Sequence, residues 1–243
     1  MKGDVAVQMG SIWLLVFLCT AVAPAVQRDI PVRGDDSDWW SDVAFASTPQ
    51  THLQHRELAA STLEIGNIRV GLGEIDKAAA RFGKARVMSR GDASSSRIQA
   101  CYVSEDSQTH LIFQEDGEGF GAEFYLFKDG PRWNSSDLCA KSPLVSGDIA
   151  TASGLHLGMT PAEVEALLGH PSVASAEYLR YDLQVRKRTT ADDLAKMRAQ
   201  HPKMSGKELN DSYGFYYVTS TVVAKFKDSK LTYLDVGRYE SYP

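Results

Sequence analysis

The sequence predicts an α+β protein built as two tandem modules, each with short helices packed on an antiparallel sheet. A short helical pattern bounded by glycines occurs twice, at 65–87 and at 154–172. Each copy is followed by three segments whose apolar and polar residues alternate, as in half-buried strands. The chain has 243 residues, of which 43% are hydrophobic, so it can form one large domain or two small ones.

The N-terminal residues 1–25 are predicted to be a signal peptide. Residues 12–23 (IWLLVFLCTAVA) form an apolar run that is short for a membrane span. Small residues at 23–25 favour cleavage after Ala25, and an uncleaved N-terminal anchor is the alternative. A bacterial lipoprotein signal needs a small residue before its cysteine, but Leu18 precedes Cys19. We therefore expect a soluble periplasmic or secreted protein.

Cleavage after Ala25 would leave two cysteines, Cys101 and Cys139, in the mature chain. Two cysteines in an oxidising compartment favour a disulfide, so we predict that these two are bonded. Two unpaired buried thiols are the alternative.

Residues 26–61 are predicted to be a tether followed by a helix at 49–61. The tether contains RGDDSDWWSD (33–42), whose charge indicates loose order, while Trp39 and Trp40 indicate that something covers them. His52 and His55 have a spacing that metal sites use, but no third ligand lies near them in the sequence. We expect a solvated helix face there, and no metal or cofactor.

The first repeat is assigned to residues 62–140. Its helix has an apolar face made of Ile75, Ala78, Ala79 and Phe82, and its strands are expected at 97–105, 109–114 and 121–129. The segment 115–121 (EDGEGFG) contains a glycine-rich pattern. Its acidic residues would repel phosphate, so a hairpin turn is expected.

The second repeat is assigned to residues 141–243. Thr160 and Glu163 have the spacing of a capping box, with Pro161 at the first helical position. Val164, Leu167 and Leu168 are expected to form the buried face of this helix, which Gly169 and Pro171 end. Strands are expected at 177–185, 215–226 and 230–239, with an insertion at 186–214 that holds a helix over 189–201.

These residues carry a resemblance. The pattern GLHLGMTPAEVEALLGHPS…YLRYDL…VVAKFKDSKLTYL resembles the SmpA/OmlA type of bacterial envelope protein, whose members include barrel-assembly lipoproteins. Two copies in tandem are similar to the secreted β-lactamase inhibitor protein family. The resemblance covers 154–239 well and 63–129 more loosely, and it implies a helix-on-sheet module that binds partners on the open sheet face. The chain departs from both families, because it has no evident lipobox and only one mature cysteine pair.

Several function classes are disfavoured by the sequence. The net charge of −5 argues against general nucleic-acid binding. The chain contains neither a Gly-x-Ser-x-Gly elbow nor a His-Glu-x-x-His motif nor a phosphate-binding loop. His110 and His156 alternate into strand-like segments, where a solvent-facing role is commoner than catalysis. We therefore expect a protein that is not an enzyme, with an unrecognised hydrolase as an alternative.

The expected function is an exported, protein-binding module of the bacterial cell envelope. Its alternatives are an accessory factor for outer-membrane assembly or envelope integrity, and a secreted enzyme inhibitor. The partner is expected to be a protein in the envelope or outside the cell, and membrane association to be indirect. Because tyrosine and tryptophan are favoured at interfaces, the candidate partner-binding residues are Tyr216, Tyr233, Trp39 and Trp40.

Overall fold

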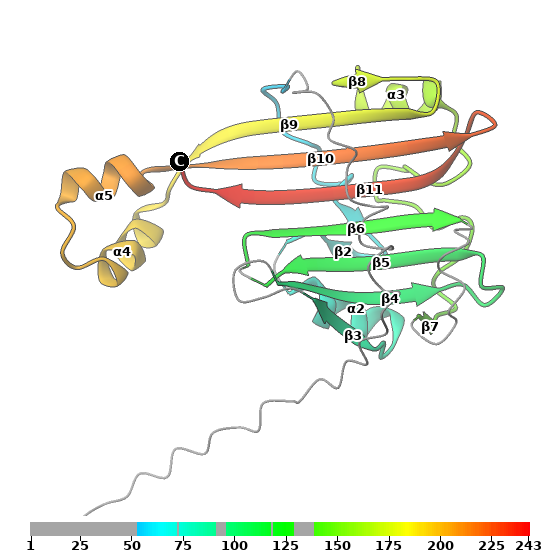
Figure 1. Ribbon diagram of the computed structural model, residues 1–243, viewed down its shortest axis with the longest axis horizontal. Helices are drawn as coiled ribbons and strands as arrows, with labels where there is room; N and C mark the ends of the chain where they lie inside the picture. The colour runs from blue at the N-terminus through cyan, green and yellow to red at the C-terminus, as the bar shows by residue number, and fades with distance from the viewer. Residues whose placement is uncertain (1–52, 72, 91–95, 118, 129–138) are drawn as a thin grey trace, which may run out of the picture.

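The structure is a computed structural model, and it describes residues 53–71, 73–90, 96–117, 119–128 and 139–243. They form an α+β fold around one nine-stranded sheet with the order β3-β4-β5-β6-β11-β10-β9-β8, and β7 pairs with β4 (Figure 1). The pairs along this order are antiparallel, and β4 with β7 is parallel. The predictions on the signal peptide, Cys19, Trp39, Trp40 and His52 lie outside the described residues.

Two meanders of strands make up this sheet. The first consists of β3 (Val87–Arg90), β4 (Arg97–Val103), β5 (Thr109–Asp116) and β6 (Gly121–Lys128). The second consists of β8 (Val173–Ala174), β9 (Tyr178–Arg188), β10 (Phe215–Lys227) and β11 (Lys230–Ser241). The six strands predicted from alternation are all present. The last strands of the two meanders, β6 and β11, pair and join them.

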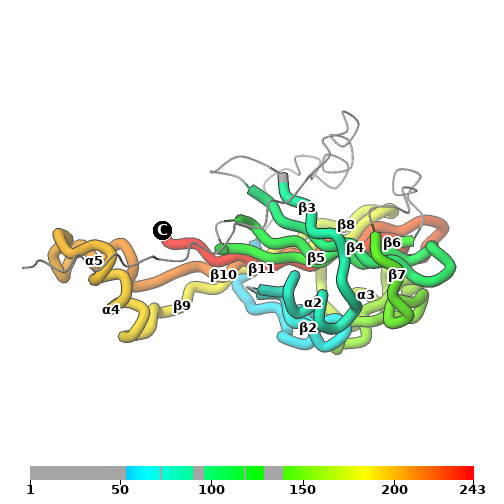
Figure 2. Tube along the Cα trace, turned by 90° about the horizontal axis from the view of Figure 1, so that it is seen from below, coloured from blue at the N-terminus to red at the C-terminus, as the bar shows by residue number. Residues whose placement is uncertain are grey.

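The remaining elements are short. They are β1 (Glu64–Ile65), β2 (Ile68–Arg69), β7 (Ala140–Lys141), α2 (Glu74–Phe82), α3 (Pro161–Leu168), α4 (Ala191–Gln200) and α5 (Gly206–Tyr213). Figure 2 shows α2, α3 and β2 on the same side of the sheet, which we call the core face. The helices α4 and α5 form an arm at the end of β9 and β10 (Figure 1). Among the described residues, no helix is long and apolar enough to span a membrane.

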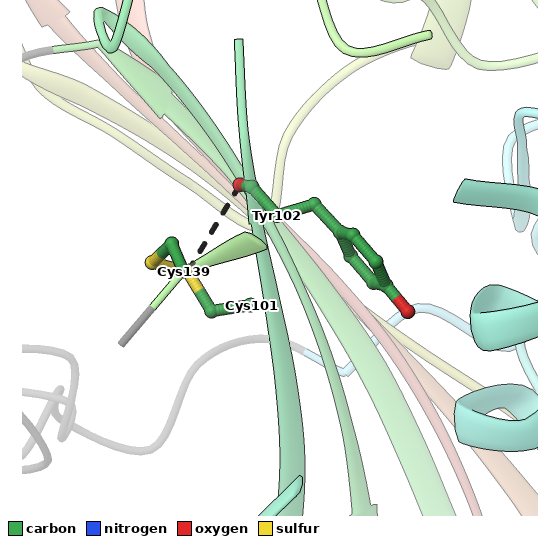
Figure 3. The surroundings of a disulfide bond; sticks show 3 residues. All are labelled: Cys101, Tyr102 and Cys139. Atoms are coloured by element: carbon green, nitrogen blue, oxygen red, sulfur yellow. Dashed lines mark hydrogen bonds between the residues drawn. A yellow bond between two sulfur atoms is a disulfide. The ribbon is translucent and has the colours of Figure 1, made fainter. Parts of the chain in front are cut away.

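Strand alternation divides each strand between the core face and the opposite side, the outer face. On β4, Tyr102 belongs to the main hydrophobic core, whereas Cys101 belongs to a second buried cluster with Ile112, Tyr125 and Phe127. Figure 3 shows the Cys101–Cys139 disulfide on one side of β4 and the ring of Tyr102 pointing to the other side. The predicted disulfide is thus present, on the outer face.

Helix α3 has the predicted capping box. The Thr160 hydroxyl accepts a hydrogen bond from the Glu163 N–H at 3.3 Å, and the Glu163 carboxylate accepts one from the Thr160 N–H at 2.7 Å. Val164 and Leu168 are buried as expected, but Leu167 is 45% exposed, so its assignment to the buried face is wrong. The helix has only eight residues. Only a narrow stripe of so short a helix can therefore touch the core.

The predicted helix at 49–61 is wrong for its described part, residues 53–61. Gln54 forms a parallel bridge with Leu183 instead. The Gln54 N–H donates to the Asp182 carbonyl, and the Gln54 carbonyl accepts from the Gln184 N–H, both at 2.9 Å. Backbone groups bonded to a sheet edge cannot also form helical hydrogen bonds. This long-range pairing outweighs helix propensities, which differ by roughly 0.7 kcal/mol per residue or less.

We predict a ranking of substitutions in α3. Leu168→Ala should destabilise the fold by about 2–5 kcal/mol, because it removes a buried side chain. Thr160→Ala should cost about 1 kcal/mol through the lost cap. Leu167→Ala should change the free energy of unfolding by less than about 0.5 kcal/mol, as is usual for surface positions. Urea denaturation of the three variants measures the order, and an effect of Leu167→Ala as large as that of Leu168→Ala would contradict this packing.

A second prediction concerns the disulfide, whose cysteines are 38 positions apart. Replacing both cysteines with serine should lower the free energy of unfolding by up to about 4 kcal/mol, the loop-entropy value for this separation. Thermal unfolding with and without reductant should show the same loss in the wild-type chain and no effect of reductant in the variant. Peptide mapping that finds free thiols in freshly prepared protein would refute the bond.

Candidate functional site

The outer face has two parts that differ in exposure. On β4, β5 and β6 its side chains are buried, including Gln99, Gln114 and Phe127. On β9, β10 and β11 many of its side chains are half-exposed or exposed. We call the latter set the open face; it consists of Tyr178, Arg180, Gln184, Arg186, Arg188, Phe215, Tyr217, Thr219, Thr221, Lys225, Tyr233 and Tyr239.

Where the two parts meet, buried polar side chains form a network around Glu123 of β6. The Glu123 carboxylate accepts hydrogen bonds from the Tyr125 and Tyr239 hydroxyls and from the Gln114 amide. The Gln114 amide also donates to the Tyr125 hydroxyl at 3.2 Å. Tyr239 comes from β11, so this network crosses the pairing between β6 and β11. We call Gln114, Glu123, Tyr125 and Tyr239, together with Asp235, the acid–tyrosine cluster.

Asp235 is the second acid of the cluster and has a different environment. It pairs with Tyr125 in the β6–β11 register and is only 1% exposed. Its Oδ1 atom has no hydrogen-bond partner within the described part of the chain. A buried carboxylate without such a partner is costly, so the site favours the neutral acid.

Burial raises the pKa of both acids. For Glu123, burial is the largest cause, and the hydrogen bonds from Tyr125 and Tyr239 oppose it. For Asp235, burial raises the pKa well above its usual range, the charge of Glu123 adds to this, and Lys225 and Arg180 act in the opposite direction. The two acids interact, so their protons are lost as a pair rather than independently.

Two glycines allow this cluster to close. A Cβ atom at Gly121 would lie 2.0 Å from the Tyr239 ring, and one at Gly237 would lie 3.1 Å from the Thr221 hydroxyl. The ring of Tyr239 therefore lies directly on the backbone of β6, which brings its hydroxyl to Glu123. Glycine within a strand often marks such a close approach.

The open face displays aromatic rings beside cations. The Lys225 ammonium lies 4.9 Å from the centroid of the Tyr233 ring, and the Arg186 guanidinium lies 4.0 Å from that of Phe215. The Arg180 Nε atom donates to both oxygens of the buried Asp182, at 2.9 and 3.0 Å. Partly exposed tyrosine residues beside cations offer apolar ring area to a partner, which suits a protein interface.

The structure separates the residues that the sequence singled out. Tyr233 lies on the open face, with its ring centroid 6.2 Å from that of Phe127. Strand alternation puts Tyr216 on the other side of β10, where its ring centroid lies 6.2 Å from that of Tyr242. His110 is buried and stacks on Phe127 at 5.0 Å, while His156 is exposed in the segment before α3. The fold therefore brings neither the two tyrosines nor the two histidines together.

Sequence reasoning missed the acid–tyrosine cluster. Glu123 and Asp235 each stand at an alternating position of an otherwise apolar strand, within GAEFYLF and LDVGRY. An acid at such a position is a visible signal, but alternation does not show which strand will be its neighbour. Among the described residues, no group of three or more His, Cys, Asp or Glu side chains could hold a metal ion.

The chain was compared with protein-family models, with curated proteins and with solved structures, and none of these comparisons gives a match. The resemblance to the SmpA/OmlA type therefore rests on the sequence motifs.

The buried acids predict a specific dependence of stability on pH. Because the folded-state pKa values are raised, the folded chain holds protons that the unfolded chain releases above pH 3.8–4.5. Stability should therefore fall as pH rises from there through the raised pKa values. Asp235→Asn keeps the shape of the side chain but cannot become charged. The free energy of unfolding of this variant should therefore fall less steeply with pH, and at pH 8 it should exceed that of the wild type by about 1–3 kcal/mol.

The matched control is Asp182→Asn. Asp182 is also buried, but its carboxylate accepts hydrogen bonds from the Arg180 guanidinium. The variant should lose this ion pair with Arg180. We expect this variant to be less stable than the wild type at pH 8. Guanidinium denaturation of both variants between pH 5 and 9 measures these effects; an unchanged pH slope in Asp235→Asn would rule out the neutral acid.

Proposed function

We propose that this chain is an exported, non-enzymatic protein-binding module of the cell envelope, and that the open face is its partner surface. The observation that carries the proposal is the set of half-exposed tyrosines on three neighbouring strands, Tyr178, Tyr217, Tyr233 and Tyr239. The strand backbones hold these rings at fixed positions, so little conformational entropy is lost when a partner binds.

The two faces of the sheet support this role differently. The core face is used for stability, because α2, α3 and the β1–β2 pair lie on it (Figure 2). Within the described part of the chain, no such apolar layer lies on the open face, which combines rings, hydroxyls and cations. An antiparallel sheet with one packed and one polar face is a common arrangement, and the polar face is then available for binding.

The proposed location rests on the N-terminal sequence and on the disulfide. Disulfides persist in oxidising compartments such as the periplasm or the extracellular medium. The Cys101–Cys139 bond agrees with the export that residues 1–25 predict. We propose a periplasmic or secreted protein, with indirect association with the outer membrane as the alternative.

We further propose that the two meanders are tandem copies of one module of the SmpA/OmlA type. In each half a short helix precedes a meander of strands, with α2 before β3–β6 and α3 before β8–β11. The last strand of one half pairs with the last strand of the other. This arrangement is what two fused copies related by an approximate twofold axis would give.

The partner class decides between the two alternatives within this proposal. Co-purification with components of the outer-membrane assembly machinery would favour an accessory factor for assembly or envelope integrity. Co-purification with a soluble secreted enzyme, together with inhibition of its turnover, would favour an inhibitor. The experiment is an affinity purification of the mature chain from envelope extract after cross-linking.

We predict that tyrosines on the open face dominate partner affinity. Tyr217→Ala or Tyr233→Ala should weaken binding by about 10-fold or more, as expected when an interface aromatic is removed. Tyr216→Ala is the matched control, because it alters the neighbouring residue of the same strand on the opposite side. Titration of each variant against the purified partner measures the effect; equal losses for Tyr216→Ala and Tyr217→Ala would remove the open face as the site.

A further inference from the structure

We propose that the open face is also the docking site of the chain's own acidic tryptophan segment, residues 33–42 (RGDDSDWWSD), which competes there with the partner. This inference rests on the proposed function of the open face as a protein-binding surface. It gives the chain a self-occupied state that a partner must displace.

The charges of the open face favour an acidic occupant. The exposed charged side chains that the outer face presents on β9, β10 and β11 are cationic and include Arg186, Arg188 and Lys225. The two acids on the same strands, Asp182 and Asp235, are buried, and Asp182 is paired with Arg180. An approaching segment therefore meets positive charge beside tyrosine rings.

The segment 33–42 has the complementary composition. It contains four aspartates, one arginine and the adjacent pair Trp39 and Trp40. Its aspartates suit the cations of the open face, and its indole rings suit a surface of tyrosines and cationic side chains. It thus combines an acidic charge with an aromatic pair, as this surface requires.

The place where the tether joins the fold puts the segment within reach. The first described residues, Leu53 and Gln54, lie at the outer edge of β9, where Gln54 bonds to the Asp182 and Gln184 backbones at 2.9 Å. Trp40 is 14 positions before Gln54, a length of chain that spans up to about 45 Å. Three strands are about 10 Å across, and each end of β9 lies five residues, or about 17 Å, from Leu183, so the segment can reach every part of the open face.

A short tether also favours docking within one chain over docking between copies. A tether of this length gives an effective local concentration on the order of 1 mM. A segment whose free peptide binds with a Kd of about 100 μM would therefore occupy its own face about nine-tenths of the time. Even weak contacts would be enough to establish this state.

The test uses a fluorescent peptide of residues 33–46 and two forms of the mature chain, wild type and Trp39→Ser/Trp40→Ser. The peptide should bind the double variant, and bind the wild type about 10-fold more weakly, because its own segment competes. Raising the salt from 50 to 500 mM should weaken binding several-fold through screening. Arg186→Glu/Lys225→Glu in the double variant should weaken it by 10-fold or more, whereas Tyr216→Ala should have no effect.

Three outcomes would overturn the proposal. They are absence of peptide binding to the double variant, equal peptide binding to both forms, and a wild-type dimer in sedimentation that the double variant does not form. The third outcome would place the segment on a second copy instead. If the peptide fails to bind while Tyr217→Ala still lowers partner capture, docking of the segment is wrong and the proposed function stands. If the peptide binds while Tyr217→Ala leaves partner capture unchanged, the proposed function fails instead.

Discussion

The pairing of β6 with β11 is the constraint on which the rest of this structure depends. Its register runs from Phe127 with Tyr233 to Gly121 with Tyr239, and it converts two separate meanders into one sheet. Each meander alone would expose the edge of its last strand, and exposed edges invite aggregation. The pairing satisfies both edges at once and gives the two halves a common core on one side.

The same pairing explains why acids are buried in the middle of a sheet. Glu123 and Asp235 stand on the two paired strands, and Tyr239 donates to Glu123 from one strand to the other. Hydrogen bonds satisfy Glu123, whereas the unpartnered oxygen of Asp235 favours the neutral form. The cluster therefore specifies the register of the junction, because a slip of one residue on either strand would move that strand's acid into the apolar core face. Burial raises the pKa of both acids, so the stability of the junction depends on pH.

The outer face divides into a sealed part and a half-exposed part, and we propose the second for recognition. Around β4–β6 it is sealed, with the disulfide, Ile112 and Phe127 forming a second apolar cluster. Around β9–β11 it stays half-exposed, and Tyr233 lies at the boundary, packed on Phe127 on one side and close to Lys225 on the other. A binding surface that begins at a rigid, disulfide-tied cluster is well positioned, since its rings have little freedom to lose.

The sequence by itself determined the features whose causes are local. The capping box at Thr160 and Glu163, the start of α4 after Thr190 and the six long strands follow from side chains within a few positions of each other. The cysteine pair followed from the cysteine count together with the export that residues 1–25 predict. Only the tertiary structure decided which strands are neighbours and that Gln54 joins the edge of β9 rather than a helix. It also decided that Leu167 is exposed while Leu168 is buried. It also decided that Tyr233 and Tyr216 lie on opposite faces and that Glu123 and Asp235 meet. The physical reason is that hydrogen bonds and burial between distant segments carry more free energy than local propensity, and a sequence pattern of period two identifies a face without identifying its neighbours.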